Sequence, residues 1–187
     1  MPYERFAKSS LVFTAQDHAY MARALQLTER GRDTATPNPN VGCIIVKNGR
    51  IIAQAAHVKA GEMHAEALAL AVATASPEGA TVYVTLEPCA HQGRTPPCAD
   101  ALVRAKVARV VAALEDPNPL VHGRGATTLR DAGIQVDIGL MHDLGQQIPR
   151  DALAYPAEAR DQHRSFVRIG RPVVLAAAGQ VEPIERD

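Results

Sequence analysis

The residues from His64 to Cys98 place the strongest limit on how this chain can fold. They contain His64-Ala65-Glu66 and, after a strand-like stretch, Cys89 and Cys98. One imidazole and two thiolates are three of the four ligands of a tetrahedral zinc ion whose last position is left to water. Because the three side chains are far apart in the sequence, a fold that binds such an ion must bring them to one point.

Hydrophobic periodicity and turn residues divide the chain into alternating strands and helices. Asn48-Gly49 is typical of a type I′ turn and predicts an antiparallel hairpin between the strands on either side. Beyond the hairpin, helical and strand patterns alternate. The predicted strands are 41–47, 50–55, 81–86, 107–114 and 134–138, and the predicted helices are 17–30, 64–76, 98–105 and 126–132.

This alternation predicts an α/β fold with a five-stranded mixed sheet. The sheet combines the antiparallel hairpin with three parallel strands, and helices cover both of its faces. In such folds, ligands bind in the loops at the carboxyl ends of the parallel strands. Pro88-Cys89 follows the third predicted strand and Asp116-Pro117-Asn118 follows the fourth. We therefore expect the functional site at this end of the sheet.

Length and composition favour one domain with short extensions. The chain has 187 residues, of which 47% are hydrophobic, and we expect an N-terminal arm over 1–15, one domain over 16–150 and a C-terminal tail over 151–187. Twenty Lys and Arg balance twenty Asp and Glu, so no overall positive field favours nucleic acid or an anionic membrane. Neither a signal peptide nor a membrane span is evident in the sequence. These features predict a cytoplasmic protein.

Glu66 is predicted to transfer protons rather than to bind the metal. It lies two residues after His64, roughly 200° further round an ideal helix, so the two side chains cannot face an ion in the same way. A carboxylate beside a zinc-bound water can carry a proton to a heterocycle and to an amino leaving group. The alternative is a closed structural zinc site, which normally uses a fourth ligand from a second close pair. Cys43 is predicted to be a core residue, and the role of His91 stays open.

Four segments carry a more specific signal. They are Pro37-Asn38-Pro39-Asn40-Val41-Gly42-Cys43, His64-Ala65-Glu66, the run from Thr85 to Cys98, and Asp116-Pro117-Asn118-Pro119. Together they resemble the deaminase domain of the bifunctional riboflavin-biosynthesis deaminase/reductase, over about Asp17 to Gly139. The general zinc deaminase signature has two residues between its cysteines. Here eight residues lie between Cys89 and Cys98, and this longer insert is characteristic of the riboflavin branch.

The resemblance implies a cytidine-deaminase-like, three-layer α/β/α fold and a zinc-dependent hydrolase. The implied reaction converts 2,5-diamino-6-(5-phosphoribosylamino)pyrimidin-4(3H)-one into 5-amino-6-(5-phosphoribosylamino)uracil and ammonia. A guanidinium suits a phosphate, and amide and carboxylate groups suit hydroxyls. The implied residues are His64, Cys89 and Cys98 for Zn²⁺, Glu66 for proton transfer, Asn38 and His57 for the pyrimidine, and Arg94, Asp116 and Asn118 for the ribose phosphate.

The C-terminal segment departs from the bifunctional pattern. Gly170-Arg171-Pro172-Val173-Val174 resembles the entry to the reductase domain, and the sequence ends at Asp187. We therefore expect no reductase domain and no NADPH. The deaminase would then act either in riboflavin biosynthesis, with a reductase on a separate chain, or in a specialised pathway that draws on the same intermediate. A homo-oligomer is expected because apolar segments of the tail need burial. The alternatives are another zinc deaminase, acting on cytidine, guanine or a tRNA base, and a non-catalytic partner of a reductase.

Overall fold

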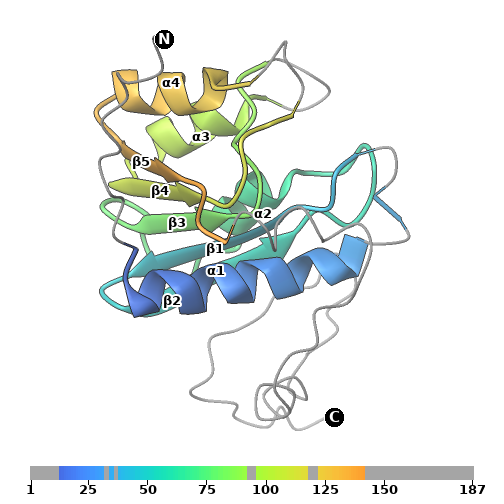
Figure 1. Ribbon diagram of the computed structural model, residues 1–187, viewed down its shortest axis with the longest axis horizontal. Helices are drawn as coiled ribbons and strands as arrows, with labels where there is room; N and C mark the ends of the chain where they lie inside the picture. The colour runs from blue at the N-terminus through green and yellow to red at the C-terminus, as the bar shows by residue number, and fades with distance from the viewer. Residues whose placement is uncertain (1–12, 32–33, 36–37, 92–95, 118–121, 142–187) are drawn as a thin grey trace, which may run out of the picture.

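A β-hairpin forms one edge of the sheet in the computed structural model, which describes residues 13–31, 34–35, 38–91, 96–117 and 122–141 (Figure 1). Strands β1 (Gly42–Lys47) and β2 (Arg50–Ala56) pair antiparallel. The turn residues Asn48 and Gly49 have φ angles of 50° and 73°. Positive φ at both positions is what a type I′ turn requires, so the predicted hairpin is confirmed.

The other three strands extend the sheet in the order β2-β1-β3-β4-β5. Strand β3 (Thr81–Val84) is antiparallel to β1, whereas β4 (Arg109–Ala112) and β5 (Gln135–Ile138) continue parallel to β3. The predicted mixed sheet of a hairpin and three parallel strands is therefore confirmed. The carboxyl ends of β3 and β4 lie next to each other, so the loops that follow them are neighbours.

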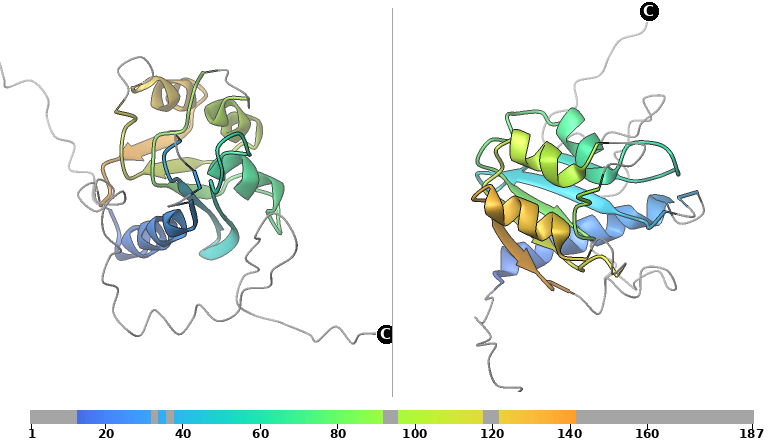
Figure 2. Two further views of the ribbon diagram at one scale, coloured as in Figure 1. Left: turned by 90° about the vertical axis from the view of Figure 1, so that its right-hand side faces the viewer. Right: turned by 90° about the horizontal axis from the view of Figure 1, so that it is seen from above.

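Helices cover both faces of the sheet, which gives the predicted three layers (Figure 2). Helix α1 (Ala15–Thr28), followed by a short 3₁₀ turn (Glu29–Gly31), packs on one face. It lies so close to β1 that a side chain at Gly42 would collide with the carbonyl oxygen of Ala24. The other face carries α2 (Ala65–Ala71), α3 (Cys98–Arg104) and α4 (Arg124–Asp131).

Two helix boundaries differ from the prediction for identifiable reasons. Helix α1 begins at Ala15 instead of Asp17 because Thr14 and Asp17 form a capping box. The end of the predicted arm 1–15 therefore belongs to this helix. Helix α2 ends at Ala71 instead of Ser76 because the N–H and hydroxyl of Thr74 both donate to the Ile52 carbonyl in β2. The predicted tail 151–187 lies outside the described residues.

A buried polar cluster joins α1 to three strands on the α1 face. Asp17, only 2% exposed, accepts hydrogen bonds from Arg109 Nη1 and from the Tyr83 hydroxyl, both at 2.7 Å. Arg109 Nε also donates to Asp137 at 2.7 Å. Burial opposes ionisation of Asp17, but the hydrogen bonds from Arg109, Thr14 and Tyr83 outweigh it and hold its pKa below the usual value. The cluster therefore holds α1 against β3 and β4, and this contact depends on the ionised carboxylate of Asp17.

The Asp17→Asn variant is expected to lower the free energy of unfolding by about 3 kcal/mol, because Arg109 loses one of its two buried carboxylate partners. A lowered native pKa means that this stabilisation is complete above the unfolded pKa of about 3.9 and is lost as the pH falls. Urea unfolding should therefore show a larger difference between the variant and the parent chain near pH ~7 than near pH ~3.

The control for this prediction is Glu78→Gln, which removes an exposed ion pair with Lys106. It should change the free energy of unfolding by less than about 1 kcal/mol. Equal stability of Asp17→Asn and the parent chain at neutral pH would contradict the prediction.

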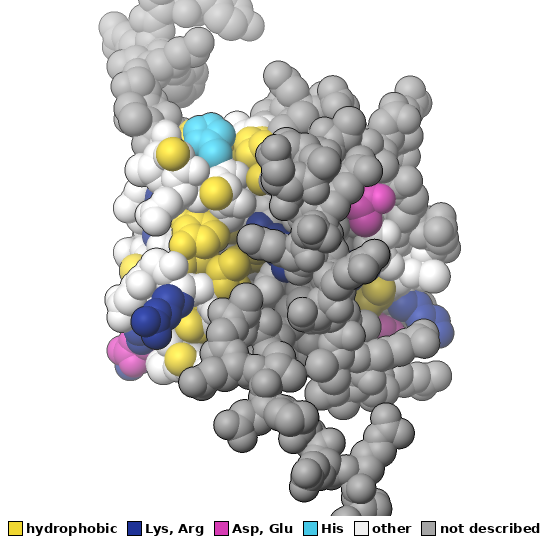
Figure 3. Space-filling model, turned by 90° about the horizontal axis from the view of Figure 1, so that it is seen from below, with side chains coloured by type: hydrophobic (Ala, Val, Ile, Leu, Met, Phe, Trp, Pro, Cys, Tyr) yellow, Lys and Arg dark blue, Asp and Glu magenta, His cyan; other side chains and the backbone are white. Residues whose placement is uncertain are grey.

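The surface of the described residues exposes little large apolar area. Met63, 44% exposed, is the one large hydrophobic residue that is exposed among them. On the face in Figure 3, the hydrophobic side chains of the described residues lie in groups among polar atoms. None of the described helices has the length and apolar character needed to cross a membrane.

Candidate metal centre and active site

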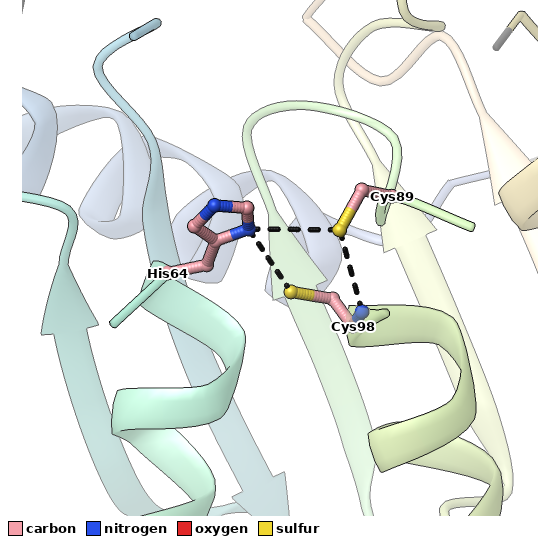
Figure 4. Close-up of side chains that lie close together, drawn as sticks. All are labelled: His64, Cys89 and Cys98. Atoms are coloured by element: carbon pink, nitrogen blue, oxygen red, sulfur yellow. Dashed lines mark hydrogen bonds between the residues drawn. The ribbon is translucent and has the colours of Figure 1, made fainter. Parts of the chain in front are cut away.

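His64, Cys89 and Cys98 point toward one another from three different segments (Figure 4). His64 Nδ1 lies 3.5 Å from the sulfur of Cys89 and 3.4 Å from the sulfur of Cys98. All three ligand atoms lie within 4.8 Å of one another. The fold therefore brings together the three residues that the sequence singled out.

The geometry of this cluster suits zinc. With Zn–S bonds of about 2.3 Å and a Zn–N bond of about 2.0 Å, tetrahedral angles place a sulfur and a nitrogen ligand about 3.5 Å apart. The two observed nitrogen–sulfur distances match this value closely. Two thiolates and one imidazole are soft and borderline donors that favour zinc over magnesium or calcium. With these three ligands from the described residues, a fourth position remains for water or substrate.

Local backbone structure explains why these side chains converge. His64 is the N-cap of α2 and has an extended backbone, Cys98 is the first residue of α3, and Cys89 lies in the loop after β3. The loop is tied to α3 twice. The Cys98 N–H donates to the sulfur of Cys89 at 3.3 Å, and the Ala99 N–H donates to the Cys89 carbonyl at 3.1 Å. The start of α3 therefore fixes both cysteines relative to each other.

The electrostatics of the cluster favour a thiolate at Cys89. Hydrogen bonds from the Cys98 thiol, from His64 and from the Cys98 N–H outweigh burial and lower the pKa of Cys89 to about 4. The hydrogen bond with Cys89 raises the pKa of His64. The pKa of Cys98 is raised by its hydrogen bond to Cys89 and by burial. Metal binding would require both sulfurs as thiolates and would therefore release protons from the cluster.

Glu66 lies beside the cluster, buried in the first turn of α2. It is 4% exposed, and it lies close enough to Cys89, His64 and Cys98 for all three to affect its pKa. Burial raises the pKa of Glu66 to about 7, a value suited to accepting and returning a proton at neutral pH. His64 is an extended cap residue rather than a residue of the helix, so the predicted helical rotation of about 200° between His64 and Glu66 does not apply.

Asn38 and His57 come together next to the metal cluster. The His57 and His64 rings meet edge to face, with centroids 5.5 Å apart. His57 Nδ1 lies 3.0 Å from the Met63 carbonyl oxygen, so this nitrogen must carry the proton. Nε2 therefore accepts from the Asn38 amide nitrogen, also at 3.0 Å. This arrangement fixes the Asn38 amide, whose oxygen accepts no hydrogen bond from the described part of the chain.

The remaining predicted residues fall into two groups. Asp116 follows β4 and is half-buried, close to the loop that carries Cys89. His91, in that loop, is exposed. Arg94 and Asn118 lie outside the described residues. Cys43 is fully buried in β1, and burial raises the pKa of its thiol, in agreement with the prediction of a core residue.

Sequence reasoning missed Glu87, a 4% exposed carboxylate two residues before Cys89. Its oxygens accept hydrogen bonds from the backbone N–H groups of Asp116, Gly123 and Ala126. These groups belong to the loop after β4 and to the start of α4. The sequence offers one signal for Glu87, which is an acidic residue directly after an apolar strand. This signal does not indicate which groups the carboxylate bonds to.

Comparison with known proteins identifies the class to which this fold and site belong. Residues 14–114, more than half of the chain, match the cytidine and deoxycytidylate deaminase zinc-binding region. The chain belongs to this family of zinc-dependent deaminases. A dCMP deaminase from the cyanophage S-TIM5, at 22% identity and a TM-score of 0.53, has the same fold. The predicted cytidine-deaminase-like architecture is therefore confirmed.

Within this class, the more similar relatives are proteins of riboflavin biosynthesis. Riboflavin biosynthesis protein RibD of Escherichia coli is 58% identical over 138 residues, which are 74% of this chain and 38% of that protein. Diaminohydroxyphosphoribosylamino-pyrimidine deaminase of Buchnera aphidicola is 48% identical over 132 residues, covering 71% of this chain and 90% of that protein. The structure of Acinetobacter baumannii RibD, form 1, has a TM-score of 0.70 and 54% identity, covering 71% of this chain and 37% of that one. The chain thus spans less than two fifths of the length of these two RibD proteins.

Proposed function

We propose that this chain removes the 2-amino group of 2,5-diamino-6-(5-phosphoribosylamino)pyrimidin-4(3H)-one by zinc-dependent hydrolysis. The products are 5-amino-6-(5-phosphoribosylamino)uracil and ammonia. One observation carries the proposal: a buried carboxyl group, Glu66, lies against a three-ligand cluster that leaves a coordination position open. The name and 90% coverage of the Buchnera relative support the choice of substrate.

The chemistry requires one proton carrier and one water. His64, Cys89 and Cys98 would hold a zinc ion, which would act as a Lewis acid and lower the pKa of water at the site toward about 7. Glu66 accepts a proton from the attacking water, and the water oxygen bonds to the ring carbon that carries the amino group. Glu66 passes this proton to the adjacent ring nitrogen. It then moves the hydroxyl proton to the amino group, the carbon–nitrogen bond breaks, and ammonia leaves as the carbonyl forms.

The neighbouring residues suit recognition of a phosphorylated pyrimidine. With its nitrogen held by His57, Asn38 presents its amide oxygen, an acceptor for an N–H group of the pyrimidine. Both ring nitrogens of His57 are engaged within the protein, so its part in recognition is to orient Asn38. Asp116 suits a ribose hydroxyl, and Arg94 and Asn118 are proposed for the phosphate side.

Assembly, partners and cellular location follow from the sequence-based expectations. A homo-oligomer, a separate reductase partner and a cytoplasmic location remain predictions. The sequence has a formal charge of zero, which does not favour a tRNA substrate. Riboflavin biosynthesis and a specialised pathway use the same substrate in this proposal, so the reaction is the same in both.

A substrate panel tests the assignment. Purified, zinc-loaded protein is expected to release ammonia from the diaminopyrimidine nucleotide, with a product mass that corresponds to exchange of NH₂ for OH. Removing the phosphate should lower kcat/KM by about 10- to 100-fold, the loss expected when charge-assisted hydrogen bonds disappear. Cytidine, guanine and an adenosine-containing tRNA serve as the other arms. Turnover of any of these in preference to the nucleotide would replace the proposed substrate.

A further inference from the structure

Glu87 connects the two loops that flank the candidate site. Its carboxylate accepts hydrogen bonds from the Asp116 N–H at 3.2 Å, the Gly123 N–H at 2.9 Å and the Ala126 N–H at 3.0 Å. Within the described part of the chain, its partners are therefore backbone donors and not a cation. Because this buried carboxylate accepts three backbone hydrogen bonds at once, its position is tightly specified.

Two further contacts hold the same loops together. The Glu87 N–H donates to the Leu114 carbonyl oxygen at 2.8 Å. At the start of α4, Gly125 lies against the neighbouring residue Pro88, so that a side chain at Gly125 would collide with the Pro88 carbonyl oxygen. The loop that carries the metal-cluster residue Cys89 and the segment that carries Asp116 are therefore packed as one unit, with the Glu87 carboxylate between them.

This arrangement also limits how an anion can bind here. A helix N-terminus commonly offers its free N–H groups to a phosphate. In α4, the Gly123 and Ala126 N–H groups already donate to Glu87. An acidic side chain at this position also interacts favourably with the positive end of the helix dipole. These two donors are therefore not available to a phosphate of the substrate.

We infer that Glu87 is a positioning residue, which holds Asp116 at a fixed place relative to the metal-cluster loop and so sets the affinity for the ribosyl part of the substrate. The inference rests on the proposed function for the identity of the substrate. It does not give Glu87 any contact with the reacting atoms. Cys89 lies in the loop after β3 and Asp116 in the loop after β4. Glu87 belongs to the first of these loops, and its side chain bonds to the second.

The test compares Glu87→Gln with two other variants of the full chain. Glutamine keeps the size of the side chain but replaces one oxygen by an NH₂ group, so at least one of the three N–H groups meets a donor. KM for the diaminopyrimidine nucleotide is expected to rise about tenfold, with kcat within about threefold of the parent value, the pattern of lost ground-state binding. Bound zinc should remain at the parent level. Glu78→Gln, at an exposed position, should leave all values unchanged.

Leu129→Ala separates positioning from general stability. Leu129 is fully buried in α4 and makes no hydrogen bond to Glu87 through its side chain. This variant should lower Tm at least as much as Glu87→Gln while leaving KM at the parent value. A parent-like KM in Glu87→Gln, or an equal rise in KM in Leu129→Ala, would overturn the inference.

Amide hydrogen exchange provides a second measurement that needs no substrate. In Glu87→Gln, the amides of Asp116, Gly123 and Ala126 are expected to lose more protection than the amides of β4. Uniform loss across the chain would overturn the positioning role. If the parent chain fails to deaminate the nucleotide, the proposed function fails, and this exchange pattern alone decides whether Glu87 fixes the Asp116 segment.

Discussion

The Glu66→Gln variant is expected to release ammonia from the diaminopyrimidine nucleotide at least about 10³-fold more slowly than the parent chain. Glutamine has nearly the same shape but can neither accept the proton of the attacking water nor return it to the leaving amino group. Loss of a positioned acid–base group typically costs about 10²- to 10⁴-fold, and here one group serves two successive transfers. The measurement is kcat by ammonia release, with the zinc content of the same samples determined in parallel.

The matched control is Glu62→Gln, the same substitution four residues earlier in the chain. Glu62 is exposed and precedes α2, so its replacement should leave both kcat and the zinc content unchanged. Zinc should also stay bound in Glu66→Gln, because Glu66 is not one of the three clustered ligands. A Glu66→Gln protein that keeps zinc and retains more than about a tenth of the parent kcat would show that another group transfers the proton.

The order of the secondary structure elements could be predicted because each carries a local signal. The Asn48-Gly49 turn and the alternation of strand and helix patterns were enough to give the hairpin, the three parallel strands and the layers. The end of α2 could not be predicted in the same way. Apolar spacing continues past Ala71, but Thr74 bonds to Ile52 in a strand, a competition that is decided by tertiary structure.

The same division applies to the site. The metal cluster was predictable because the residue types and the elements that carry them limit the ways in which His64, Cys89 and Cys98 can meet. The Asn38–His57 hydrogen bond was not, since it depends on a histidine tautomer fixed by the carbonyl oxygen of Met63. Such details depend on angles and distances between segments far apart in the sequence, which spacing along the chain does not encode.

The buried polar groups of this chain serve two different ends. Asp17 and Arg109 form their ion pair on the α1 face of the sheet, whereas the helices that carry the metal ligands pack on the other face. This ion pair holds helix α1 against the sheet. The buried carboxylate of Glu87 instead joins two loops at the site through hydrogen bonds. Burial of a charge alone therefore does not identify a catalytic group in this fold. Glu66 stands apart because it lies against an open metal cluster.

The Cys98→Ala variant is expected to lose both bound zinc and the stabilisation that zinc gives. Cys98 supplies one of three clustered ligands, and its removal should weaken zinc binding by more than the about 10- to 100-fold that is typical of changes outside the ligand set. A metal that binds only the folded chain stabilises it by about 4 kcal/mol at a concentration a thousand times Kd. A chelator should therefore lower Tm of the parent chain and leave Tm of Cys98→Ala unchanged.

Cys43→Ala gives this prediction a control with the same substitution at a cysteine of similar burial. Cys43 is fully buried in β1, and burial keeps its thiol protonated by raising its pKa, so it should not bind the ion. We expect Cys43→Ala to lose some packing energy but to keep full zinc content and full sensitivity to the chelator. If Cys98→Ala retained zinc, or if Cys43→Ala lost it, the ligand set would be wrong, and Glu66 would lose the open coordination position on which its proposed role depends.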